Sequence, residues 1–325
     1  MHSHANSIGS PRSGLAAGVA SKAAATHSAT VATGQAVAMS HAKGPAISAA
    51  IIHNSSPSRL FIRDQLTQFC RDLQIPVSEV VEQPPLSACR SMAWTRLYLA
   101  ARECMKILCS AAYLRASRRR PWCVILVVVV KELRHVLHLL CRASREHLTT
   151  AYRRSQVELI LSSKHFAAWK RALDMQSNWA LVFEDDAEVA PDSKFRFKQL
   201  VDHGFVDGFL GRIAYVDLAG GFAPALVLPL QHACFASDDV WVFNGLITNT
   251  TCSYLASQST MAAWVETLKR WPVLLQLPAD HMINFISLPV VSGLRDVFSI
   301  HLREPLFCHG SFRGSTPSLI SQPTA

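Results

Sequence analysis

Three consecutive carboxylates follow a short apolar run near the middle of the chain. Residues 179–183 (WALVF) lead directly into Glu184, Asp185 and Asp186. Like charges a few ångströms apart repel one another, and burial disfavours each ionised form further. A divalent cation relieves both costs, and hard carboxylate oxygens are the ligands that Mg²⁺ and Mn²⁺ prefer. We therefore predict a Mn²⁺ or Mg²⁺ site at this triplet; the alternative is an acidic surface turn.

The spacing within the triplet predicts how its side chains divide. Side chains alternate along an extended segment, so Glu184 and Asp186 should share one face and Asp185 should point to the other. On this basis we expect Glu184 and Asp186 to hold the ion directly.

Apolar strands and amphipathic helices are expected on both sides of the triplet. In residues 158–175, Leu161, His165 and Trp169 share a helix face, so His165 is expected to be a satisfied core histidine. Ser257 is a plausible N-cap for a later helix. We predict strands over residues 46–54, 179–183 and 212–218, and helices over residues 58–73, 158–175, 257–271 and 280–286.

Residues 122–130 (WCVILVVVV) are the most apolar run of the chain. The run is about half the length that a helix needs to cross a bilayer, so we predict a buried strand. Residues 133–141 are expected to be helical. Residues 90–154 carry 14 Lys or Arg against three Glu. This basic, inserted segment is expected either to be a set of solvated helix faces or to make peripheral contact with an anionic membrane.

The composition limits the classes of protein that remain. Half of the 325 residues are hydrophobic, which excludes a wholly disordered chain. Residues 1–48 are rich in Ala, Ser, Gly and His and have no aromatic residue, so we predict a disordered or targeting segment. The nine cysteines show no C-x-x-C and no zinc-finger spacing. Two sequons, at Asn54 and Asn249, permit an endomembrane location; a cytoplasmic or organellar one stays open.

The run SSKHFAAWKRALDMQSNWALVFEDDAEV resembles the core signature of glycosyltransferase family 25, the lipopolysaccharide and collagen galactosyltransferase-like enzymes. In that family a helix of pattern S-H-x-x-x-W-x-x-A-L precedes a strand that ends L-E-D-D. The helix residues here are Ser163, His165, Trp169, Ala172 and Leu173, and the strand end is Phe183, Glu184, Asp185 and Asp186. This chain has VELILSSKH where the family has G-E-I-G-C-x-x-S-H, with Lys164 inserted between Ser163 and His165.

The resemblance implies a fold and a reaction. It implies a GT-A type α/β fold, a Rossmann-like sandwich with a central, mostly parallel sheet, formed by a catalytic domain over residues 49–320. It implies a hexosyltransferase that uses a UDP-sugar donor and a metal ion and inverts the anomeric carbon. The expected acceptor is a glycan, a lipid-linked sugar or a protein, and no nucleic acid partner is expected. LPADHMINF resembles the family's P-x-D segment, which makes Asp280 a candidate base that competes with Asp239.

The closing run EPLFCHGSFRGSTPS resembles the tail with which such transferases cover the donor. Neutral imidazole binds Mn²⁺, so His309 is a candidate metal ligand. Arg313 has the planar fork that suits a phosphate, and with Ser311 it is a candidate contact to the nucleotide. The glycines at 310 and 314 give this run hinge-like freedom. The alternative is an exposed polar tail with a surface histidine.

Two other functions stay open at this point. One is another metal-dependent phosphotransferase or nuclease that uses the same triplet, which the basic segment favours. The other is a non-catalytic binding protein with a transferase fold, which the departed motif before His165 favours.

Overall fold

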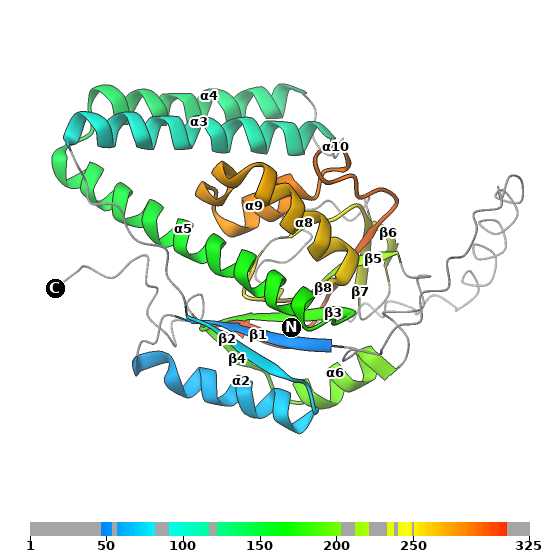
Figure 1. The fold of residues 1–325 in the computed structure, drawn as a ribbon. Helices are drawn as coiled ribbons and strands as arrows, with labels where there is room; N and C mark the ends of the chain where they lie inside the picture. The colour runs from blue at the N-terminus through cyan, green and yellow to red at the C-terminus, as the bar shows by residue number, and fades with distance from the viewer. Residues whose placement is uncertain are drawn as a thin grey trace, which may run out of the picture. The chain divides into compact units, whose positions relative to one another are not determined.

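The computed structural model describes residues 47–53, 57–81, 91–116, 122–202, 212–220, 233–236, 240–248 and 250–310. They belong to one compact unit, Lys43–Ala325 (Figure 1). The strands are β1 (Ile47–Ile52), β2 (Val77–Val80), β3 (Trp179–Glu184), β4 (Ala187–Val189), β5 (Ile213–Asp217), β6 (Ala233–Ala236), β7 (Val240–Asn244), β8 (Ser253–Ser257), β9 (Phe298–Leu302) and β10 (Phe307–His309). The α-helices are α2 (Leu60–Asp72), α3 (Met92–Ala116), α4 (Trp122–Cys141), α5 (Arg145–Asp174), α6 (Ser193–Asp202), α8 (Gln258–Arg270), α9 (Ala279–Ile286) and α10 (Pro289–Ser292). Two 3₁₀ turns are η1 (Pro57–Arg59) and η3 (Pro272–Gln276).

The described strands form one large sheet and one small one. The large sheet has eight strands in the order β2-β1-β3-β8-β5-β9-β7-β6. The pairing gives β2, β1, β3, β5, β9 and β6 one direction, whereas β8 and β7 run the other way. The prediction of an α/β fold with a central, mostly parallel sheet is therefore confirmed. The small sheet pairs β10 with β4 in antiparallel register.

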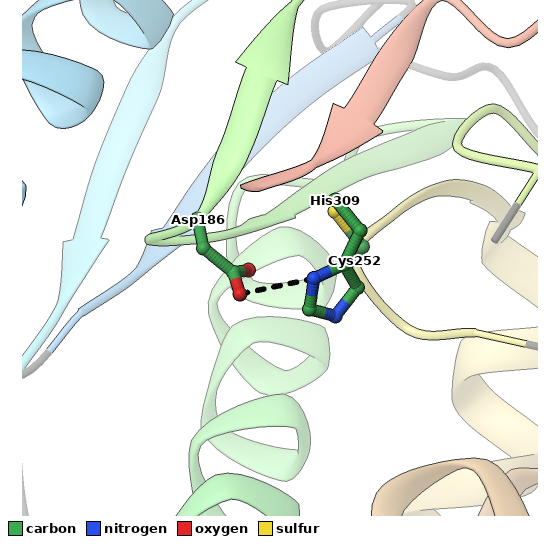
Figure 2. A group of neighbouring side chains, drawn as sticks. All are labelled: Asp186, Cys252 and His309. Atoms are coloured by element: carbon green, nitrogen blue, oxygen red, sulfur yellow. Dashed lines mark ion pairs between the residues drawn. The ribbon is translucent and has the colours of Figure 1, made fainter. Parts of the chain in front are cut away.

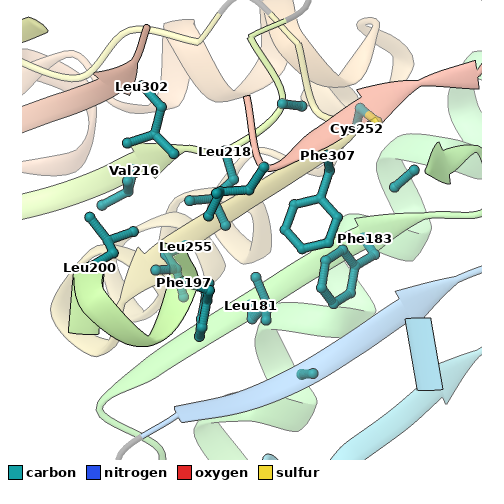
Figure 3. Packing of buried hydrophobic residues seen from close by; sticks show 14 of the residues in the cluster. Leu181, Phe183, Phe197, Leu200, Val216, Leu218, Cys252, Leu255, Leu302 and Phe307 are labelled. Carbon is teal, nitrogen blue, oxygen red and sulfur yellow. The ribbon is translucent and has the colours of Figure 1, made fainter. Parts of the chain in front are cut away.

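Helices cover both faces of the large sheet (Figure 1). On one face, α2 and α6 bury Phe69, Phe197 and Leu200 against strand residues such as Phe183. Figure 3 shows Phe197 and Leu200 in this core, with Phe183. On the other face, α5 and α8 bury Trp169 and Trp264, whose ring centroids lie 4.6 Å apart. Together these two cores hold the carboxyl ends of the strands in place.

Several sequence predictions of individual elements are confirmed. The strand at residues 46–54 is β1, and the helices at residues 58–73 and 280–286 are α2 and α9. The strands at residues 179–183 and 212–218 are β3 and β5. Ser257 caps α8, because its side chain accepts a hydrogen bond from the Thr260 backbone N–H. The helix at residues 158–175 is the second half of α5, which begins much earlier, at Arg145.

The prediction of a buried strand at residues 122–130 is wrong, because this run opens α4. A short apolar run has no periodicity that separates a strand from a helix. In the structure, α4 packs against α3 through a small core that includes Ala100, Ile107 and Val136. Other positions of α4 leave large apolar side chains exposed, at Leu126, Val127, Val130, Leu133 and Leu137. None of the described helices has the length and apolar character that a membrane span requires.

The basic segment at residues 90–154 corresponds to α3, α4 and the first part of α5. A core of Leu99, Leu139 and Leu148 joins these three helices, and Arg96 donates hydrogen bonds to the backbone carbonyls at the end of α4. The segment is therefore a packed helical layer of its own. That residues 90–154 are an insertion into the catalytic domain stays a prediction. Residues 1–46 lie outside the described residues, so the predicted disordered or targeting segment is not described beyond Ile47 and Ser48, which begin β1.

Candidate functional site

The chemistry-bearing residues gather at the carboxyl edge of the large sheet. Glu184 ends β3 and Asp217 ends β5. The strand between them, β8, runs the opposite way, so its leading residues Thr251 and Cys252 lie at the same edge. Ligands of open α/β sheets bind at this edge, which makes it the candidate site.

Glu184 is held by two donors on the side of the sheet that α5 covers. The hydroxyl of Thr251 donates to Oε1 of Glu184, and Nε2 of His165 lies 3.3 Å from the same oxygen. Burial raises the pKa of Glu184, but the His165 contact and the Thr251 hydrogen bond lower it more. The pKa of Glu184 is therefore below its ordinary value, and the carboxylate is ionised at neutral pH.

Asp185 and Asp186 turn away from the strand, so the expected alternation does not continue past Glu184. These two residues form the turn between β3 and β4. Asp185 faces Arg59, whose Nη1 lies 2.6 Å from Asp185 Oδ1 and 3.6 Å from Asp186 Oδ2. Arg59 ends the 3₁₀ turn that follows β1, and its side chain is 5% exposed. A buried guanidinium beside two carboxylates stabilises their ionised forms.

Asp186 and His309 meet because the small sheet brings the end of the chain back to the triplet (Figure 2). In that sheet His309 pairs with Ala187, the residue after Asp186. Nδ1 of His309 lies 3.1 Å from Oδ2 of Asp186. The backbone N–H of Gly310 also donates to the Asp186 carbonyl at 2.8 Å. The structure thus brings together two of the four residues predicted as metal ligands.

Cys252 is the third member of this cluster. Asp186, Cys252 and His309 each offer one ligand atom, and these atoms all lie within 4.8 Å of one another. Burial raises the pKa of the Cys252 thiol well above its ordinary value, and the negative charges of Asp186 and Glu184 raise it further. Without a cation the residue is therefore a neutral thiol.

A buried network links the signature helix to the triplet. The Tyr254 hydroxyl accepts a hydrogen bond from Trp169 Nε1 at 2.9 Å and lies 2.9 Å from His165 Nδ1. Because the other nitrogen of His165 faces Glu184, the chain of contacts runs from Trp169 through Tyr254 and His165 to the site. His165 is a satisfied core histidine, as predicted, and it also fixes the orientation of Glu184.

A further acidic residue, Asp217, lies at the same edge of the sheet. Its Oδ1 accepts hydrogen bonds from the backbone N–H groups of Ala219 and Gly220, both at 3.0 Å. Its Oδ2 lies 3.4 Å from Nδ1 of His301, and both side chains are almost completely buried. Gly220 has φ +52°, a left-handed conformation that glycine adopts readily and that this turn requires. Asp217 therefore shapes the loop that leaves β5.

Of the other predicted site residues, the structure describes Asp280 and does not describe Asp239, Ser311 or Arg313. Asp280 lies in the first turn of α9, half-buried, and the ligand cluster of Asp186 does not include it. Asn284, one turn further along α9, bonds both the N–H and the carbonyl of Thr248. The predictions for Asp239, Ser311 and Arg313 lie outside the described residues.

Three residues of the site were missed by sequence analysis. Asp217 lies near the end of the predicted strand at residues 212–218, so a search for carboxylates at strand ends would have found it. Arg59 lies just beyond the turn after the first strand, where a ligand loop is common. No sequence pattern pointed to Cys252, because its partners Asp186 and His309 lie in two distant segments at no recognisable spacing from it.

No known protein-family model matches the chain, and no curated protein matches it in sequence. Among solved structures, the chain is similar to the crystal structure of a glycosyltransferase involved in the glycosylation of the major capsid of PBCV-1. The two are 10% identical with a TM-score of 0.35, over 82% of this chain and 94% of that one. A likeness at this level does not show a shared function. The resemblance to glycosyltransferase family 25 stays a prediction.

Proposed function

We propose that this protein is a glycosyltransferase that moves a hexose from a UDP-sugar to an acceptor hydroxyl, with a divalent cation and with inversion at the anomeric carbon. The observation that carries the proposal is the contact between Asp186 and His309 at the carboxyl edge of the sheet. A carboxylate and an imidazole that converge there form a cation site beside the position where α/β folds take nucleotides.

The donor set fits a divalent cation. Asp186 and His309 would hold it directly, and Glu184 at the end of β3 is an ionised carboxylate that interacts electrostatically with His309. When bound, a cation of this kind neutralises the charge that develops on a leaving nucleoside diphosphate. Mn²⁺ or Mg²⁺ suits the carboxylate oxygens, and Mn²⁺ also accepts imidazole.

The protein's own groups hold this site in one arrangement. Arg59 fixes Asp185 by an ion pair of 2.6 Å, so the turn after β3 keeps its shape. His165 and Thr251 fix the carboxylate of Glu184. Groups that are held before substrate arrives need no reorganisation during the reaction. The site is therefore preorganised for a charged donor.

A carboxylate must take the proton from the acceptor hydroxyl, and Asp280 and Asp239 are the candidates. Ser311 and Arg313 are the proposed contacts to the donor phosphates. The acceptor is proposed to be a glycan, a lipid-linked sugar or a protein.

Donor hydrolysis tests the proposal. The full chain is incubated with Mn²⁺ and a panel of UDP-sugars, and released UDP is measured. A transferase releases UDP slowly from its own donor even without acceptor. Hydrolysis of single-stranded DNA or RNA without UDP release would favour a nuclease. No UDP release from any donor, together with no binding of UDP, would favour a binding protein with a transferase fold.

A further inference from the structure

The three ligand atoms of Asp186, Cys252 and His309 come from separate parts of the chain. Asp186 lies in the turn between β3 and β4, Cys252 directly before β8, and His309 on β10. The antiparallel pairs β3–β8 and β4–β10 bring these segments together. Figure 2 shows the cysteine beside the Asp186–His309 pair. The arrangement is thus fixed by the backbone of two sheets.

The separations suit one bound ion. An ion with four tetrahedral ligands at about 2.0–2.3 Å places its ligand atoms roughly 3.3–3.8 Å apart. Two of the atoms here are 3.1 Å apart, and all three lie within 4.8 Å of one another. The 4.8 Å limit exceeds the tetrahedral spacing by about 1 Å, so a small movement of the side chains would place the three atoms around one ion.

We propose that Cys252 is the third ligand of this site, and that the site takes a divalent cation that accepts sulfur, such as Zn²⁺ or Co²⁺, in preference to Mg²⁺. This inference rests on the proposed function only for what the bound ion does in the reaction. The set of three ligands is argued from their positions alone. Thiolate sulfur and imidazole nitrogen favour Zn²⁺ and Co²⁺, whereas Mg²⁺ requires oxygen ligands in near-octahedral geometry.

Binding of the cation would release one proton from the protein. The thiol of Cys252 loses its proton to solvent as the sulfur–metal bond forms, and His309 and Asp186 bind as the neutral imidazole and the carboxylate. Three protein ligands would leave a fourth position for a phosphate oxygen of a nucleotide, as catalytic zinc sites leave one for water or substrate. His309 is the most exposed of the three, with a side chain 16% exposed against 6% for Asp186 and a fully buried Cys252.

Cobalt spectroscopy tests the ligand set without any assay of activity. The full chain is freed of metal, and one equivalent of Co²⁺ is added. A cobalt–thiolate bond gives a sulfur-to-metal charge-transfer band in the near ultraviolet. We expect this band in the wild type and its loss in Cys252→Ser. A matched control is Cys308→Ser, since Cys308 is also buried and lies next to His309 in sequence but is not a member of the ligand cluster.

Two results would overturn the inference. One is a band that persists in Cys252→Ser and disappears in Cys308→Ser. The other is a wild type that binds Co²⁺ without the band. Zinc affinity should fall at least about 100-fold in Cys252→Ser, whereas Mg²⁺ affinity should change little.

A measurement on the wild type covers the case in which Cys252→Ser does not fold. X-ray absorption of the protein with one equivalent of Zn²⁺ should show one sulfur neighbour at about 2.3 Å. Only nitrogen and oxygen neighbours would overturn the inference. A sulfur neighbour together with no release of UDP from any donor would uphold the metal site and contradict the proposed glycosyl transfer instead.

Discussion

Nδ1 of His309 lies 3.1 Å from Oδ2 of Asp186, and the strand that carries the histidine is held by three backbone pairings to β4. The Gly310 N–H and the Asp186 carbonyl add a fourth contact, at 2.8 Å. The site therefore depends on how firmly β10 is anchored. Phe307 supplies that anchor, because it is fully buried two residues before His309.

Replacement of Phe307 by alanine should destabilise the fold strongly. Its ring packs edge-on against Phe183 at 4.8 Å and against Phe69 at 5.1 Å. Truncation of a buried phenylalanine costs about 3–5 kcal/mol, as lost burial and a cavity add together. Urea unfolding measures the change. Phe61→Ala, at a site 70% exposed, is the control and should change stability by less than about 0.5 kcal/mol. Equal effects would mean that β10 is not anchored by this core.

Removal of residues 311–325 should weaken nucleotide binding and leave the fold intact. A cut after Gly310 keeps β10, so the melting temperature should stay within a few degrees. Loss of an Arg313 contact to a phosphate should lower UDP affinity about tenfold, as expected for one charged hydrogen bond. Calorimetry of UDP binding checks this, with Arg313→Gln in the full chain as the matched variant. Unchanged affinity in both proteins would remove Ser311 and Arg313 from the proposed site.

The stability that Glu184 contributes should depend on pH. Its pKa in the folded protein is lowered, so the unfolded state binds its proton more readily. The contribution is fully present above the ordinary value of 4.5 and is lost as the pH falls from there through the folded pKa. In the presence of a chelator, the stability difference between wild type and Glu184→Gln should be largest near neutral pH and shrink in acid.

Urea unfolding across that pH range measures the difference. Glu266→Gln is the control, because Glu266 is exposed on α8 and pairs with Lys269 of the same helix. Its effect on stability should be small throughout, because an exposed ion pair contributes little. A constant difference for Glu184→Gln would contradict the account of its contacts with His165 and Thr251.

The local elements of this fold were largely predictable from sequence, and the meeting of distant segments was not. The strand before Glu184, the helix that carries His165 and the Ser257 cap follow from apolar periodicity and capping chemistry, which are local signals. The pairing of β10 with β4 joins residues far apart in the chain, and no pattern near His309 encodes its partner. For the same reason Cys252 was missed.

The run at residues 122–130 shows where a local signal fails. Its valines favour a strand by propensity, yet α3 offers a helical face on which α4 packs. Tertiary packing decided between the two. The result leaves Leu126, Val130, Leu133 and Leu137 on one exposed helix face, at i, i+4, i+7 and i+11 spacing.

The predicted peripheral membrane contact can be tested on this face. Cosedimentation with vesicles that contain anionic phospholipid should detect binding of the wild type, because the segment at residues 90–154 is basic and α4 within it exposes apolar side chains. Leu137→Asp should reduce the bound fraction several-fold. Val290→Asp, at an exposed apolar site on α10, adds the same charge and should have little effect. No sedimentation of the wild type would mean that these helix faces are only solvated.

The most direct test of the proposed function compares two Asp→Asn variants in the release of UDP. Asp186→Asn removes one charge from the proposed ligand set and should cut Mn²⁺-dependent release from the best donor about 100-fold or more, because charge stabilisation at the leaving group is lost. Asp192→Asn makes the same change at an exposed residue of φ +59°, a conformation that asparagine tolerates, and should keep near-normal activity. Near-normal release by a folded Asp186→Asn protein would contradict a metal-assisted transferase site at Asp186 and His309.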